Sequence, residues 1–148
     1  MTTGFFGLKT NNFACFLFMN MLETPWDYIP AKRKDSIVVS IINEMEIAQG
    51  SPIVGDLKIN NTLVNQNCKF GGPIIINNEF VYCTVFFRGG FLKSSGFKIA
   101  KINILSLDFF FIGDKEFLIW IQKVENNQIL FRKSLYGNPE DVYFVNNF

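Results

Sequence analysis

The chain has 148 residues, enough for one domain with a substantial core, and 49% of them are hydrophobic. It contains 18 phenylalanines and no histidine, which excludes Ser-His-Asp or Cys-His catalysis and imidazole metal ligands. Its formal net charge of +1 is not the basic footprint of a nucleic-acid-binding protein, so we expect no nucleic-acid partner.

Residues 1–35 contain Pro25, Pro30, a basic run and a mixed apolar block, unlike the β-rich remainder, and we expect them to form a separate N-terminal segment. The pattern fits an irregular stretch, a short helix or an edge strand equally well. The basic run at residues 32–34 is followed by Asp35 and predicts a solvated turn before a strand. The apolar run at residues 13–22 lacks a following cleavage site and is shorter than the roughly 20 residues of a membrane span. We therefore expect no membrane partner and a cytoplasmic protein.

Residues 36–148 are predicted to form one all-β domain. Clustered β-branched residues favour a strand from Ile37 to Ile42. Between residues 79 and 87 apolar side chains occupy both alternating sets, which predicts a central strand with two covered faces. Asn tolerates positive φ, so Asn pairs indicate tight hairpins. Turns or loops are expected at residues 60–61, 77–78, 89–96, 113–115 and 126–127, and a bulge or sheet corner at residues 70–73 (Phe-Gly-Gly-Pro).

The order of these elements predicts the fold class. Strands joined by short polar turns, with no long amphipathic helix, are typical of an antiparallel meander. The hairpins that turn at residues 77–78 and 126–127 are similar to propeller blades, but two or three blades cannot close a ring. We therefore expect an all-β fold in which the meander forms a sandwich or a strongly twisted open sheet of about eight strands.

Few side chains offer catalytic chemistry. Glu44 and Glu46 lie two apart on a predicted strand, so they would point the same way and bracket a bond or bind a cation, or simply form a polar face turned to water. Cys68 and Cys83 have no CxxC spacing and no base beside them, which indicates neutral thiols in a reducing compartment. We expect no metal, no cofactor and no enzymatic activity.

The aromatic surplus is the strongest remaining signal. Three consecutive phenylalanines stand at residues 109–111, and on a strand at least one of them must face away from the other two. An uncovered aromatic patch marks a protein contact, although the codon bias of an AT-rich genome explains part of the surplus. The candidate partner-binding residues are Trp26, Arg88, Phe91, Lys93 and Phe110, an aromatic patch with a charged rim.

Between Ser36 and Leu135 the chain resembles small uncharacterised all-β proteins of AT-rich bacteria, which are often similar to immunity partners of polymorphic toxins. The resemblance implies a non-enzymatic protein that neutralises a toxin by binding it, and it carries over no functional residue. The alternatives are a small-ligand binder or carboxylate-dependent hydrolase, and a structural subunit whose Phe-rich face closes a homodimer. The segments that carry the resemblance are residues 50–55, 70–73, 96–103 and 118–127.

Overall fold

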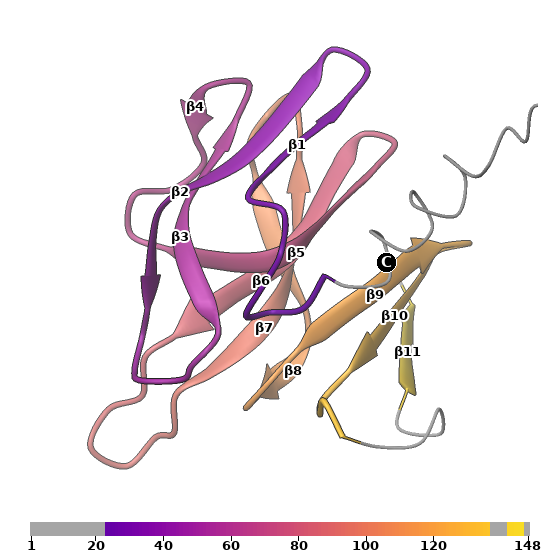
Figure 1. Cartoon of the computed structure of the whole chain (residues 1–148). Helices are drawn as coiled ribbons and strands as arrows, with labels where there is room; N and C mark the ends of the chain where they lie inside the picture. The colour runs from indigo at the N-terminus through magenta and orange to yellow at the C-terminus, as the bar shows by residue number, and fades with distance from the viewer. Residues whose placement is uncertain (1–22, 137–141, 147–148) are drawn as a thin grey trace, which may run out of the picture.

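A computed structural model describes residues 23–136 and 142–146 (Figure 1). The regular structure in these residues is entirely antiparallel β-strand, which confirms the predicted all-β class. None of the described residues belongs to a helix long and apolar enough to cross a membrane. The strands are β1 (Ala31–Lys34), β2 (Ile37–Glu46), β3 (Ile53–Ile59), β4 (Thr62–Leu63), β5 (Lys69–Asn77), β6 (Phe80–Phe87), β7 (Gly96–Asn103), β8 (Phe109–Glu116), β9 (Trp120–Glu125), β10 (Gln128–Arg132) and β11 (Val142–Asn146).

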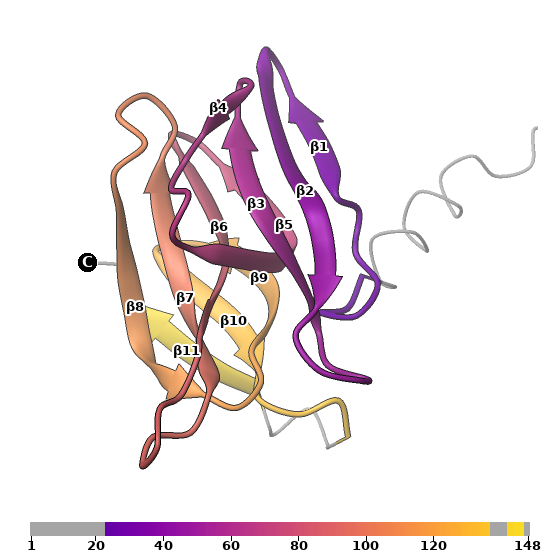
Figure 2. The same cartoon turned by 90° about the vertical axis from the view of Figure 1, so that its left-hand side faces the viewer.

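Two sheets form in the described part of the chain. The larger has eight strands in the order β1-β2-β3-β5-β6-β7-β8, with β4 paired to β3, and the smaller has the order β11-β10-β9. Neighbouring strands of the large sheet mostly follow one another in the chain, as a meander requires. Figure 2 shows this sheet strongly twisted, with β1 and β2 at one end and β7 and β8 at the other. The predicted strongly twisted open sheet is confirmed, with a small second sheet added.

Strand β6 has both faces covered, as its alternation predicts. Val81, Cys83 and Val85 face a core that also contains Leu57 of β3. Tyr82, on the other face, belongs to a second core built largely with the three-stranded sheet. All four of these β6 residues are buried. The large sheet therefore packs its own halves together on one face and the small sheet on the other.

The predicted asparagine turns are confirmed. Asn60 and Asn61 join β3 to β4, Asn78 joins β5 to β6, and Asn126 and Asn127 join β9 to β10. All five have φ between 48° and 66°. Asparagine accepts this left-handed backbone at less cost than most residues, so these hairpins are set by local chemistry.

Two expected turns are wrong. Gly113, at φ 76°, lies inside β8, where the register shifts between the pairs Phe97↔Glu116 and Ile99↔Ile112. Residues 113–115 are thus a bulge in β8, and glycine supplies the left-handed backbone that the bulge needs. Residues 32–34 are not a turn either, because they form β1 against β2 and the turn falls on Asp35, at φ 54°.

Strand β5 bends at the predicted bulge. It pairs with β3 only through Val54↔Gly71 and Gly55↔Phe70, and its register with β6 shifts between Gly71 and Ile75. Beyond the bend, β5 has no backbone pairing with β3. Its carbonyl oxygens there accept hydrogen bonds from lysines of β1 instead.

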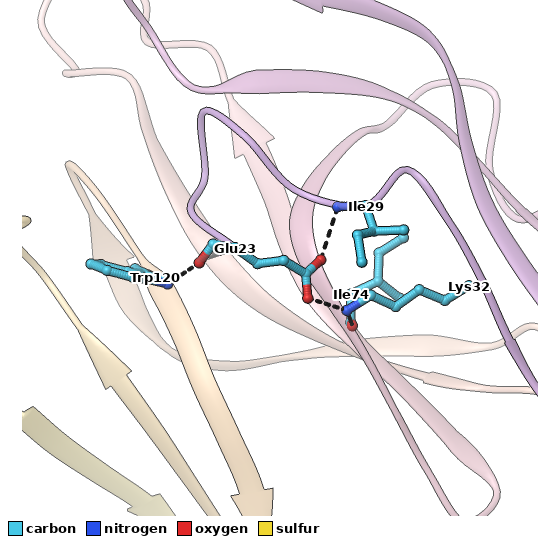
Figure 3. Close-up of polar contacts among 5 residues, drawn as sticks. All are labelled: Glu23, Ile29, Lys32, Ile74 and Trp120. Carbon is cyan, nitrogen blue, oxygen red and sulfur yellow. Dashed lines mark hydrogen bonds and ion pairs between the residues drawn. The ribbon is translucent and has the colours of Figure 1, made fainter. Parts of the chain in front are cut away.

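One of these lysines, Lys32, belongs to a polar cluster that joins β1, β5 and β9 (Figure 3). Lys32 Nζ donates to the carbonyl oxygen of Ile74 at 2.8 Å and forms an ion pair with Glu23 at 2.6 Å. The Glu23 carboxylate also accepts from the backbone N–H of Ile29 at 2.9 Å, and the Glu23 carbonyl accepts from Trp120 Nε1 at 3.0 Å. The start of the described chain is thereby fixed against both sheets.

We expect Lys32→Met to lower the free energy of unfolding by about 1–3 kcal/mol, because it leaves a partly buried carboxylate and a strand carbonyl without their donor. The Lys32 and Glu23 side chains are only 23% and 11% exposed. Lys34→Met is the matched control, since the exposed Lys34 makes one longer hydrogen bond, 3.3 Å to the carbonyl of Ile76. Urea unfolding measures both variants. Equal losses for the two would contradict the role given to the Glu23–Lys32 pair.

Candidate partner-binding surface

An apolar groove of about 380 Å³ lies at one end of the large sheet, beside the β6–β7 loop. We call it the loop-end groove. Its lining comes from four parts of the chain that are far apart in sequence. They are Trp26, residues 47–52 between β2 and β3, Phe86 and Phe97 at the base of the β6–β7 loop, and Phe117 after β8.

Trp26 is held in the groove wall by hydrogen bonds. Thr24 Oγ1 accepts from the backbone N–H groups of Trp26 and Asp27, at 3.3 and 3.1 Å, which closes a tight turn. The indole Nε1 of Trp26 donates to the carbonyl oxygen of Gly50 at 2.8 Å. With its polar atom bonded, the ring contributes a fixed apolar surface to the groove.

Three large apolar side chains of the groove and the adjoining β6–β7 loop are almost fully exposed: Phe91, Leu92 and Phe117, of which Phe117 lines the groove. Phe91 and Leu92 are in the β6–β7 loop (residues 88–95). The loop is closed by hydrogen bonds from the Gly89 N–H to Ser95 Oγ (2.8 Å) and from the Lys93 N–H to the Gly90 carbonyl oxygen (3.3 Å). It therefore presents Phe91 and Leu92 to solvent from a defined turn.

The charges of this loop are all positive. Residues 88–95 contain Arg88 and Lys93 and no acidic residue. In the part of the chain that the structure describes, neither makes an ion pair. Lys115 joins the same region, because its Nζ donates to the carbonyl oxygen of Ser94 at 2.7 Å. The lining of the loop-end groove is thus largely apolar, and the loop that adjoins it carries only positive charges.

The structure groups four of the five predicted residues. Trp26 lines the groove, and Arg88, Phe91 and Lys93 lie in the loop whose base forms part of the lining. Phe110 is elsewhere, because it pairs in register with Lys101 of β7, whereas the loop follows the pair Phe87↔Gly96.

Two exposed residues of this surface were missed from sequence. Leu92 directly follows Phe91 in a glycine-bracketed loop, and that position is a signal that could have found it. Phe117 directly follows Glu116, the last residue of β8, and β9 begins only at Trp120. Phe117 therefore lies in the connection between the two sheets.

The phenylalanine triplet behaves as predicted. Phe109 and Phe111 face the same side, where their rings contact Phe70 (5.8 Å between centroids) and Phe87 (5.0 Å), respectively. Phe110 faces the other side, 5.9 Å from Lys101 Nζ. Phe110 and Phe111 remain 48% and 42% exposed.

A second groove, of about 820 Å³, is polar. It lies between the β5–β6 and β9–β10 turns, and its lining includes both asparagine pairs, at residues 77–78 and 126–127. Asn77 Nδ2 donates to the carbonyl oxygen of Val124 at 3.1 Å, which holds the two hairpins side by side. The two blade-like hairpins noticed in the sequence are therefore neighbours in space.

The candidate catalytic groups are not gathered into a site. Glu44 and Glu46 are exposed near the end of β2 and line neither groove. Burial raises the pKa of the Cys83 thiol far above its ordinary value, and burial also raises the pKa of Cys68. Both thiols are thereby kept neutral. The described residues contain no group of three or more side chains able to hold a metal ion.

A scan against protein-family models and searches of curated proteins and of solved structures found no match to this chain. The implied likeness to toxin immunity proteins stays a prediction.

Proposed function

We propose that the chain is a non-enzymatic protein-binding protein of the inhibitor or immunity type, which neutralises a toxin in the bacterial cytoplasm. The observation that carries the proposal is the loop-end groove, which the exposed Phe117 lines, together with the exposed Phe91 and Leu92 in the loop whose base forms part of the lining. Large apolar side chains gathered at one place on a surface mark protein contacts, and a few of them usually supply most of the binding energy.

The charge of the surface specifies the partner further. Arg88 and Lys93 lie beside the apolar residues and make no ion pair within the described residues. An acidic partner surface satisfies them, and opposite charges at the rim speed association and orient the partner. The partner is therefore a protein with an acidic rim and an apolar side chain that enters the groove.

The test uses a matched pair of leucines. Leu92 and Leu105 are each 90% exposed, but Leu105 lies in the β7–β8 turn, away from the groove. Wild type, Leu92→Ser and Leu105→Ser are used to capture proteins from an extract of the native cells. We expect Leu92→Ser to weaken capture at least about tenfold and Leu105→Ser to leave it unchanged.

The captured protein is then expressed in cells with and without this chain. The proposal requires that it stops growth alone and that coexpressed wild type restores growth. Equal capture by both leucine variants would place the contact elsewhere. Growth arrest that wild type does not relieve would rule out an immunity role.

A further inference from the structure

The two edges of the large sheet are built differently. Strand β1 has four residues, Ala31–Lys34, and three of them are basic. Short and charged edge strands resist pairing with another chain. Strand β8 has eight residues and begins with three phenylalanines. Figure 2 shows it at the outer margin of the sheet, and among the described residues it pairs only with β7.

The first half of β8 presents aromatic rings on both faces of this edge. On one face, Phe111 contacts Phe109, with 5.7 Å between ring centroids. On the other face Phe110 is 48% exposed. Lys98 Nζ lies 5.7 Å from the Phe111 ring, and Lys101 Nζ lies 5.9 Å from the Phe110 ring. Both cations come from β7, on the inner side, and the two rings keep 48% (Phe110) and 42% (Phe111) of their surface exposed, which leaves room for a further strand.

We propose that this edge pairs with β8 of a second copy of the chain, antiparallel and about a two-fold axis at Phe110. An unpaired strand edge is completed by another extended backbone, and β8 itself supplies one with aromatic side chains on both faces. In this register Phe110 lies opposite its own counterpart and Phe109 opposite Phe111. Such aromatic cross-strand pairs stabilise antiparallel sheets.

The bulge and the charges select this register. The bulge at residues 113–115 ends the regular part of the strand, so the ladder is confined to residues 108–112. Asp108 then lies opposite Ile112, and no like charges face each other. A two-fold axis at Ile112 would instead bring the bulge into the ladder and place Glu116 opposite Asp108, two like charges. The short ladder predicts a weak dimer that forms with rising concentration.

The test is sedimentation velocity over a roughly hundredfold range of protein concentration. We expect wild type to move from the 17.0 kDa mass of one chain toward twice that mass. Phe110→Lys should remain monomeric, because it places two lysines opposite each other. Phe91→Lys is the matched control: it replaces an exposed phenylalanine with the same residue, but in the β6–β7 loop, and should dimerise like wild type.

A mixing experiment tests the axis itself. Phe110→Glu should also be monomeric, whereas an equal mixture of Phe110→Glu and Phe110→Lys should dimerise, because residue 110 faces its own counterpart. The inference is overturned by a monomeric wild type, by dimers of Phe110→Lys, or by a mixture that stays monomeric. It goes beyond the proposed function and fails separately from it, because Leu92→Ser weakens partner capture without changing the mass.

Discussion

Phe70→Ala is expected to lower the free energy of unfolding by about 3–5 kcal/mol, because it leaves a cavity where a fully buried aromatic ring was. Phe70 is completely buried in the core between the two halves of the large sheet. It lies at the bend of β5, where its register partners are Gly55 of β3 and Val85 of β6. The surrounding backbone is paired on both sides and cannot collapse into the space.

The control for Phe70→Ala is Phe111→Ala, which removes the same ring from a site that is 42% exposed. Chemical denaturation gives both free energies, and thermal unfolding should show a loss of roughly 10 °C for Phe70→Ala. A cost for Phe111→Ala as large as that for Phe70→Ala would contradict the placement of the core.

Gly72→Ala is also expected to lower the free energy of unfolding. A Cβ at residue 72 would lie 2.3 Å from Cγ of Tyr28, much closer than any van der Waals contact. The Tyr28 ring is buried in the same core, and its hydroxyl donates to the carbonyl oxygen of Ile53 at 3.3 Å. The ring must move, at a cost of about 1–3 kcal/mol. Because Tyr28 is two residues from Trp26, its displacement should also disturb the loop-end groove.

A double-mutant cycle tests the Gly72–Tyr28 contact. Tyr28→Ala alone is costly, but Gly72→Ala added to it should cost little, which gives a coupling energy of at least about 1 kcal/mol. Gly90→Ala is the control glycine, because a Cβ there meets nothing within 4 Å. Additive losses for residues 28 and 72 would show that the two side chains do not compete for space.

The strands and most turns could be predicted because their causes are local. Asn126 and Asn127 favour left-handed backbone wherever they stand, and the alternation in β6 needs only the sequence of that strand. An edge strand was only one of the alternatives for residues 1–35, and the basic residues of β1 were wrongly predicted to form a solvated turn. Lys32 is bound by Glu23 and by the carbonyl of Ile74, which is 42 residues away. A contact between residues so far apart in the sequence cannot be inferred from a local sequence pattern.

Of the candidate surface, the part that lies in the β6–β7 loop could be predicted from the sequence. Glycines and serines bracket Phe91 and Lys93, so an exposed loop follows from the sequence. The groove could not be predicted from the sequence, because it depends on the hydrogen bond from Trp26 to the carbonyl of Gly50, 24 residues away. The separation of Phe110 from the loop required the strand register, which the bulge at Gly113 alters.

The bend in β5 has a consequence for how the protein unfolds. This strand pairs with β3 and β6, accepts hydrogen bonds from Lys32 at Ile74, and reaches the small sheet where Asn77 donates to Val124. Both sheets and strand β1 therefore contact the nine residues of β5, so the detachment of β5 would expose both cores at once. Despite its two sheets, the described part of the chain should melt as one cooperative unit, with coincident transitions for the fluorescence of Trp26 and Trp120 and for far-ultraviolet circular dichroism.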